Sequence, residues 1–318
     1  MVNISTKTLS AADLAKAAKM LQDGKLVAFP TETVYGLGAD ARNGTAVAAI
    51  YAAKGRPSFN PLIVHVPSLE AAQELADFDD DALALAQAFW PGPVSLVAPL
   101  KAGHGLSSLV TAGLDTVAIR VPEHALARDL LTLAGCPVAA PSANLSGQIS
   151  PTTAAHVLSG LQGRIDGVVD DGPCAVGVES TIVATNPARL LRPGGLPVEA
   201  LEAALGHPLG RDLTPDKPSA PGQLTSHYAP RAQMRLNQTD GALVLGFGPV
   251  DGALNLSRSG DLLEAAANLF SMMRQIDDMA DGDTLISVAP IPMTGLGLAI
   301  NDRLSRAAAP RSGGATTG

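Results

Sequence analysis

The chain has 318 residues, of which 46% are hydrophobic and 16% charged, and its formal net charge is −8. This composition excludes a disordered chain, and the length favours two domains over one. The acidic balance, with only one Trp, three Tyr and six Phe, argues against a surface that wraps nucleic acid or stacks its bases.

The cysteines and the hydropathy of the chain limit the cellular compartment in which we expect the protein. Cys136 and Cys174 lie far apart and neither belongs to a CxxC pair, so we expect buried thiols and no metal ligands from protein side chains. The N-terminus shows no basic-then-apolar leader, and no apolar run has the length of a membrane span. We therefore expect a cytoplasmic protein that does not contact a membrane.

Strand and helix patterns alternate along the first two thirds of the chain. Ser10 and Asp13 predict the start of a helix that Gly24 ends. Further helices are expected over 45–54, 79–90 and 123–134, and strands over 26–29, 62–66, 94–98, 116–120, 138–140, 168–170, 181–184 and 190–192. This alternation, with some hairpin-like pairs, predicts an α/β fold built on a mixed sheet.

The pattern changes between Gly206 and Pro230, where prolines and polar residues replace the periodicity and predict a linker. Strands over 242–247 and 284–289 and helices over 261–278 and 298–308 then predict a second, smaller α/β unit. We accordingly expect domains over 1–205 and 233–308, a linker over 206–232 and a flexible tail over 309–318.

Familiar catalytic signatures are missing, because the chain has no GxxxxGK[ST], HExxH or GxSxG motif. The two GxG fragments, Gly36-Leu37-Gly38 and Gly246-Phe247-Gly248, are interpreted as plain turns rather than dinucleotide loops. Evidence for a functional site must therefore come from polar side chains at the ends of the expected strands and helices.

Two cations and one imidazole stand at such ends. Lys54 and Arg56 close a helix, where cations commonly complement the helix dipole. Pro57 forces the chain outward, however, and a rigid exit would fix the Arg56 guanidinium for bidentate phosphate binding. His65 shares a strand face with Ile63 near the strand's C-terminal end, where open α/β sheets collect ligand groups, although a structural core histidine explains it equally well.

Other strands end in polar groups too. Arg120 and Arg192 each end a strand, and Ser142, Asn144 and Ser150 follow a third. A helix cap explains one short polar residue more readily than three. We therefore predict a pocket for an anionic ligand.

The linker carries one informative pair, His227 and Tyr228, directly before Ala229-Pro230. Linkers rarely hold such a pair without a contact to make. We interpret the segment as a lid packed over the site of the first domain.

Taken in order, these segments resemble the YrdC/Sua5 family, the threonylcarbamoyl-AMP synthases, and in particular its two-domain Sua5-type members. The similar segments are 30–38 (PTETVYGLG), 54–57 (KGRP), 140–147 (APSANLSG), 179–181 (EST), 191–194 (LRPG), 226–230 (SHYAP) and 295–304 (GLGLAINDRL). The resemblance implies a YrdC-like twisted mixed-sheet domain with helices, joined by the Pro-rich linker to a smaller Rossmann-like α/β domain.

The resemblance also implies a reaction. The family joins L-threonine, bicarbonate and ATP, with Mg²⁺, into L-threonylcarbamoyladenylate and pyrophosphate. A downstream tRNA threonylcarbamoyl transferase complex then modifies the adenosine beside the anticodon. No stable tRNA binding by the chain itself is expected.

By the same resemblance, site residues carry over position by position. Those implied to bind threonine are Thr33, His65, Arg120, Ala140 and Ser180. Those implied to bind the nucleotide are Arg56, Asn60, Thr116, Ser142, Asn144, Ser150, Arg192 and Tyr228. Lys54 and Arg56 are the implied catalytic residues, with Lys54 adding charge at the phosphates.

Two alternatives stay open at this point. One is an RNA-binding or ribosome-associated module, as has been considered for single-domain YrdC relatives, and the other is carbamoyl-adenylate chemistry with a different acceptor. The chain also departs from many relatives just before His227, where Gln223-Leu224-Thr225-Ser226 replaces basic residues. A contact between a linker cation and the phosphates is therefore in doubt.

Overall fold

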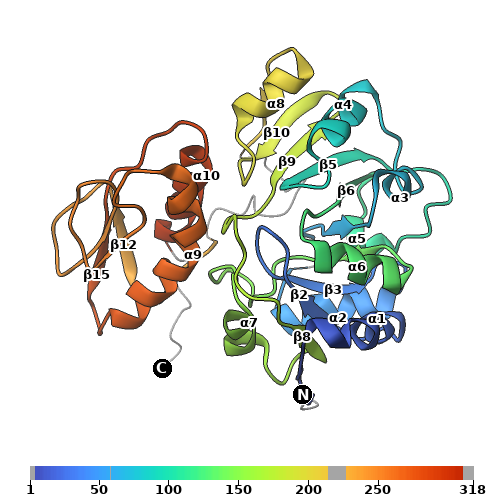
Figure 1. The fold of residues 1–318 in the computed structure, drawn as a ribbon, viewed down its shortest axis with the longest axis horizontal. Helices are drawn as coiled ribbons and strands as arrows, with labels where there is room; N and C mark the ends of the chain where they lie inside the picture. Colours follow the sequence, from blue (N-terminus) through green and yellow to red (C-terminus); the bar gives the residue numbers. More distant parts are fainter. Residues whose placement is uncertain (1–3, 58, 214–226, 311–318) are drawn as a thin grey trace.

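The computed structural model describes residues 4–57, 59–213 and 227–310. Its larger sheet is mixed, because β4 and β6 pair in parallel whereas β5 and β6 pair antiparallel, and this confirms the predicted fold class (Figure 1). The strands follow the order β1 (Lys7–Leu9), β8 (Gly167–Val169), β2 (Val27–Phe29), β3 (Gly36–Asp40), β7 (Val138–Ala139), β4 (Ile63–His65), β6 (Thr116–Arg120), β5 (Val94–Pro99), β9 (Thr181–Thr185), β10 (Ala188–Arg192) and β11 (Gly210–Arg211).

Helices cover both faces of this sheet, because successive side chains along its strands enter two different cores. Val27 and Phe29 of β2 pack in the core that holds α1 and α6, whereas Ala28 packs in the core that holds α2, α5 and α7. The helices and the short 3₁₀ turn are η1 (Ala11–Asp13), α1 (Leu14–Gln22), α2 (Gly44–Lys54), α3 (Leu69–Gln73), α4 (Asp80–Phe89), α5 (Ser108–Thr111), α6 (Ala125–Ala134), α7 (Ala154–Leu161) and α8 (Val198–Leu205).

The ends of α2 fix where two of the predicted cations lie. The Asn43 side chain accepts hydrogen bonds from the backbone N–H groups of Thr45 and Ala46 and so caps the helix. Gly55 ends it in the left-handed region, at φ 59°. The chain therefore turns sharply between Lys54 and Arg56.

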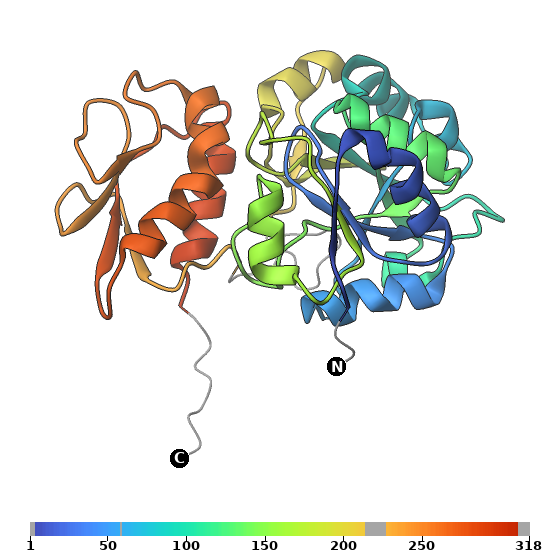
Figure 2. The same ribbon diagram turned by 60° about the horizontal axis from the view of Figure 1, so that its bottom comes forward.

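The C-terminal unit is a second sheet with two helices. Its strands are parallel and follow the order β12 (Gln233–Leu236), β15 (Leu285–Val288), β13 (Leu243–Gly246) and β14 (Leu254–Asn255). Helices α9 (Leu262–Met279) and α10 (Gly297–Ala308) lie on the side of this sheet that faces the larger one (Figures 1 and 2). The two α/β units thus meet through these helices.

Of the two GxG fragments predicted to be turns, the first is wrong. Gly36-Leu37-Gly38 lies within β3, paired with β2 and β7. A Cβ at Gly38 would meet atoms of Phe29 and Val138 at 2.9 Å, so the glycine is required by close packing and not by a turn. Gly246-Phe247-Gly248 does turn, with Gly248 at φ 60° after β13.

Several other expectations concern segments at the edge of what the structure describes. The predicted linker over 206–232 contains β11, and its residues 214–226, including Gln223–Ser226, lie outside the described residues. Residues 311–318 of the predicted tail also lie outside them.

Cys136 and Cys174 are buried free thiols, as predicted. None of the helices in the described ranges combines the length and apolar character needed to cross a bilayer.

Candidate functional site

A pocket opens at the C-terminal edge of the larger sheet, where the central strands β4 and β6 end side by side. His65 and Arg120 are paired neighbours in these two parallel strands. Ile63 and His65 both line the pocket, whereas Val64 packs in a core on the other face. The alternation predicted from the sequence for this strand is therefore confirmed.

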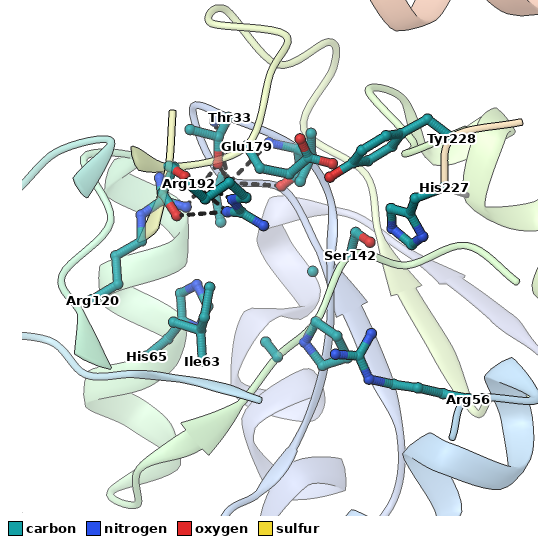
Figure 3. Close-up of a pocket in the computed structure, with 16 residues that line it drawn as sticks. Thr33, Arg56, Ile63, His65, Arg120, Ser142, Glu179, Arg192, His227 and Tyr228 are labelled. Atoms are coloured by element: carbon teal, nitrogen blue, oxygen red, sulfur yellow. Dashed lines mark hydrogen bonds between the residues drawn. The ribbon is translucent and has the colours of Figure 1, made fainter. Parts of the chain in front are cut away.

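The pocket wall draws on segments far apart in the sequence (Figure 3). Its lining residues are Thr31, Thr33, Val34, Gly36, Arg56, Ile63, His65, Arg120, Ala140, Pro141, Ser142, Glu179, Ser180, Arg192, His227 and Tyr228. They leave a cavity of about 50 Å³. Figure 3 shows Arg120 and His65 on one side of the pocket and Arg56 with Tyr228 on the other.

Most of the predicted site residues meet in this wall. Those that line it are Thr33, Arg56, His65, Arg120, Ala140, Ser142, Ser180, Arg192 and Tyr228. Those that do not line it are Lys54, Asn60, Thr116, Asn144 and Ser150. Of this second group, Lys54, Asn60 and Ser150 contact lining residues, whereas Thr116 lies at the opposite end of β6 from Arg120.

Arg120 is held rigidly at its end of the pocket. Its Nη2 lies 2.7 Å from a carboxylate oxygen of the buried Glu32, and its Nη1 donates to the Thr33 hydroxyl at 2.8 Å. Its Nε donates to the Gly92 carbonyl. A buried guanidinium with fixed partners is suited to bidentate recognition of a carboxylate.

Arg192, the last residue of β10, is held by Ser180, the residue that precedes β9. Its Nη2 donates to the Ser180 carbonyl at 2.8 Å and to the Ser180 hydroxyl at 3.3 Å. The Ser180 hydroxyl also lies 2.8 Å from the Ser95 hydroxyl. The end of β10 and the residue before β9 thus present one arginine and one hydroxyl to the same pocket.

Arg56 is fixed on the opposite side. Its Nε and Nη2 donate to the carbonyls of Asn60 and Pro61 at 3.3 and 3.0 Å. Burial lowers its pKa to about 10, so it stays charged near neutral pH. Asn60 therefore supports Arg56 through its backbone.

Lys54 does not reach the pocket wall. Its buried ammonium donates to the carbonyls of Ser142 and Asn144 at 2.5 and 2.6 Å. The Asn144 side chain in turn donates to the carbonyls of Leu145 and Gln148. This placement differs from the expected one at the phosphates, because the ammonium is used to tie the 142–144 loop to the end of α2.

Glu179 is a pocket residue that the sequence patterns did not assign. One carboxylate oxygen accepts from the Ser150 hydroxyl at 2.5 Å, and the other accepts from Arg303 Nε at 2.8 Å. Burial would raise its pKa, but Arg303 and Arg192 lower it to about 2. The run Glu179-Ser180-Thr181 directly before an expected strand was the signal that could have found it, and Arg303 lies in the similar segment 295–304, to which no site role was assigned.

His227 and Tyr228 close the Arg56 side. Their rings contact edge to face at 4.2 Å, and the Tyr228 ring stacks on Phe270 of α9 at 5.5 Å. Burial lowers the pKa of His227 to about 3, and burial likewise lowers that of His65 to about 3. Both imidazoles are therefore neutral near pH 7, and the positive charge of the pocket comes from its arginines.

Within the described residues, no group of three or more His, Cys, Asp and Glu side chains is placed to hold a metal ion. The fold and the pocket therefore define a two-unit α/β protein with an arginine-lined ligand site at a sheet edge. That site is completed by residues from the segment between the units.

Comparison with known proteins agrees with this description. The family model described as Telomere recombination, Sua5/YciO/YrdC, matches residues 19–194. The model described as Threonylcarbamoyl-AMP synthase, C-terminal domain, matches residues 196–309. The chain belongs to the Sua5/YciO/YrdC family, in its two-domain form.

Named relatives and a solved structure cover nearly the whole chain. The threonylcarbamoyl-AMP synthase of Bacillus subtilis is 43% identical, over 94% of this chain and 93% of that protein. The one of Pyrococcus abyssi is 40% identical, over 93% and 94%. The crystal structure of P. abyssi Sua5 complexed with L-threonine superposes with a TM-score of 0.88 at 38% identity, over 95% of this chain and 98% of that one.

Proposed function

We propose that the chain is an enzyme that forms L-threonylcarbamoyladenylate and pyrophosphate from L-threonine, bicarbonate and MgATP. The observation that carries the proposal is one pocket with two arginine-bearing ends, Arg120 at one and Arg56 at the other. Relatives that are 40–43% identical over more than nine tenths of the chain are named for this activity.

Threonine binds at the Arg120 end in this proposal. Arg120 pairs with the threonine carboxylate, and Thr33, His65, Ala140 and Ser180 surround the rest of the amino acid. A neutral His65 suits this place, because it does not repel the amino group, which must lose its proton before it can attack. The similar P. abyssi protein was crystallised in complex with L-threonine, which supports the assignment.

The nucleotide binds at the Arg56 end. Arg56 and Arg192 neutralise the phosphates, Ser142 and Tyr228 contact the nucleotide, and Mg²⁺ arrives with ATP as part of the substrate. Lys54, Asn60, Asn144 and Ser150 support these residues from behind the wall, and Thr116 stays a predicted nucleotide contact. Positioning and charge neutralisation are the main requirements of such a transfer at phosphorus.

The chemistry needs two bond-forming steps. The threonine nitrogen attacks the carbon of bicarbonate and releases water, which gives a carbamate. A carbamate oxygen then attacks the α-phosphorus of ATP, the bond to the β-phosphate oxygen breaks, and pyrophosphate leaves with its electron pair. The arginines stabilise the negative charge that accumulates on the leaving group.

His227 and Tyr228 line the pocket on the Arg56 side, where the nucleotide binds in this proposal, and they come from the segment between the two units. We therefore assign these two residues to a lid that withdraws to admit ATP and closes again to exclude water from the unstable carbamate.

The product would supply a cytoplasmic transferase complex that modifies tRNA at the adenosine next to the anticodon. A competing function is an RNA-binding module, but an acidic chain whose arginines converge in one pocket favours an anionic small-molecule substrate over bare RNA.

The deciding experiment incubates purified protein with MgATP, L-threonine and bicarbonate and analyses the products by mass spectrometry. We expect threonylcarbamoyladenylate and pyrophosphate, with neither formed when any one substrate is left out. ATP left intact, together with tight and salt-dependent binding of bare RNA, would instead establish the RNA-binding alternative.

A further inference from the structure

One side chain of the C-terminal unit reaches the back of the pocket. Arg303 lies on α10 and is fully buried. Its Nε donates to the Glu179 carboxylate at 2.8 Å, and its guanidinium carbon lies 5.3 Å from the centroid of the Tyr228 ring. Glu179 and Tyr228 both line the pocket. Arg303 is therefore in contact with two wall residues that belong to different segments.

We propose that Arg303 is a positioning residue through which the C-terminal domain becomes part of the active site, because its guanidinium holds Glu179 and Tyr228 at the nucleotide end of the pocket. The inference rests on the proposed function for what the pocket binds. It assigns the C-terminal domain a role in the reaction itself and not only in folding.

The energetics of burial support a specific role. A buried carboxylate is costly unless each oxygen is paired, and Glu179 receives one bond from each domain, from Ser150 and from Arg303. The orientation of Arg303 is fixed in turn by Asp302, whose carboxylate lies 2.6 Å from its Nη1 and 3.0 Å from Nε of Arg306.

Arg303 also has a donor that packing alone does not explain. Its Nη2 is buried and makes no hydrogen bond within the described residues. An unsatisfied buried donor costs free energy, so Nη2 adds nothing to the stability of the packing, and the value of the guanidinium lies in its pairing with Glu179. The guanidinium adds a positive charge and a directed hydrogen bond to Glu179.

The C-terminal domain also supplies the residues that contact Tyr228. The ring is stacked between Phe270 of α9 and the Arg303 guanidinium, and the backbone N–H of His227 donates to the Arg306 carbonyl. Tyr228 also has a positive φ of 59°, which is rare for a residue other than glycine. Contacts with α9 and α10 therefore hold the pair in place.

Without Arg303, Glu179 would remain as a buried carboxylate next to Arg192. We expect Arg192 to be drawn from Ser180 toward Glu179, which would move a cation that the nucleotide needs. The threonine end, built around Arg120 and Glu32, has no contact with Arg303 among the described residues, and Ser180 would keep its contact with the Ser95 hydroxyl, so threonine binding should change little.

The test uses the full chain and three substitutions: Arg303→Met, Glu179→Gln and both together. Pyrophosphate release is measured with ATP or threonine varied, and the dissociation constant for ATP is measured by calorimetry. We expect Arg303→Met to lower kcat/KM for ATP about tenfold or more while KM for threonine changes less than about threefold. The double variant should be no worse than the poorer single one, because both changes remove the same interaction.

Glu199→Ala is the matched control. Glu199 of α8 accepts a hydrogen bond from the backbone N–H of Gly295, so it also joins the two domains, but it is exposed and does not line the pocket. This variant should keep wild-type kinetics. If Arg303→Met does not fold, Arg303→Lys takes its place and should show a weaker loss with the same selectivity for ATP.

Wild-type ATP kinetics in Arg303→Met, equal losses for ATP and threonine, or independent losses in the double variant would each overturn the inference. If the wild-type protein forms no threonylcarbamoyladenylate, the proposed function fails instead. The calorimetric comparison of Arg303→Met with Glu199→Ala still decides whether Arg303 organises the nucleotide end.

Discussion

At the scale of single residues, the pocket is defined by how its cations are held. Arg56, Arg120 and Arg192 each donate to at least one backbone carbonyl, so their positions do not depend on a ligand. Lys54 is likewise fixed by two carbonyls, those of Ser142 and Asn144, but it does not line the pocket. Three arginines fixed in advance suit an enzyme that accelerates its reaction by electrostatic preorganisation.

Replacing Arg56 tests this arrangement. We expect Arg56→Ala to lower threonine- and bicarbonate-dependent pyrophosphate release by roughly a hundredfold or more, because the phosphates lose a fixed cation. Threonine binding, measured by calorimetry, should be retained. Arg258→Ala is the control, since Arg258 forms an exposed ion pair with Asp251 in the C-terminal domain and should leave turnover unchanged. Wild-type turnover in Arg56→Ala would refute the phosphate role.

At the scale of elements, β3 shows how packing overrules a local pattern. Gly38 lies in the middle of the strand, where a Cβ would meet Phe29 and Val138 at 2.9 Å and the Val27 carbonyl at 3.1 Å. The glycine lets β3 lie close to side chains of both of its neighbours, β2 and β7. That close packing holds the strand that leads out of the Thr33 segment of the pocket.

A matched pair of substitutions tests the packing argument. Gly38→Ala should lower the free energy of unfolding by about 1–3 kcal/mol, because the added methyl group overpacks the core. Gly44→Ala, at the start of α2, should be neutral or slightly stabilising, since its nearest contact is Ser107 Oγ at 3.4 Å. Urea unfolding of both variants measures the difference, and equal stabilities would contradict the role given to Gly38.

Elements with a strong period were predictable from the sequence. The expected strand over 116–120 and helix over 45–54 match β6 and α2 to within one residue. Alternation alone placed Ile63 and His65 together on the pocket face. In contrast, β3 was missed because two of its five residues are glycines, which are depleted in strands.

Contacts between distant segments could not be predicted in this way. Glu179 and Arg303 are 124 residues apart in the chain, and each is ordinary in its own segment. Ser150 was expected to contact the nucleotide, but its hydroxyl donates to Glu179 behind the wall. Local pattern identifies polar groups at strand ends, and only the tertiary structure shows which of them pair with each other.

At the scale of the whole molecule, the two domains share both apolar and charged contacts. Val34, Ile149 and Val178 from the larger unit belong to the hydrophobic cluster of the C-terminal unit. Arg274 of α9 donates to the Ile149 carbonyl, and Arg303 pairs with Glu179. Domain docking therefore contributes to stability, and its charged part must depend on pH.

The pH dependence has a definite sign. The pKa of Glu179 is lowered from 4.5 to about 2 in the folded protein, so its ionised form stabilises the fold above about pH 4.5. This contribution is lost as the pH falls from 4.5 toward 2. The groups that face the carboxylate are Arg303, Arg192, Ser150, Lys54, His227 and Tyr228. His227 acts in the same direction, because its depressed pKa makes protonation below pH 6.5 unfavourable for the folded state.

Comparison with Glu179→Gln isolates the Glu179 contribution, because the histidines titrate in both proteins. Between pH 5 and pH 3 we expect the wild type to lose more unfolding free energy than the variant, by about 2 kcal/mol at most. Urea unfolding at a series of pH values measures the two slopes, and Glu199→Gln, an exposed carboxylate at the same domain boundary, should retain the wild-type slope. Parallel slopes for wild type and Glu179→Gln would mean that the Glu179–Arg303 pair does not stabilise the docked domains, and acid would then have to separate them through other groups.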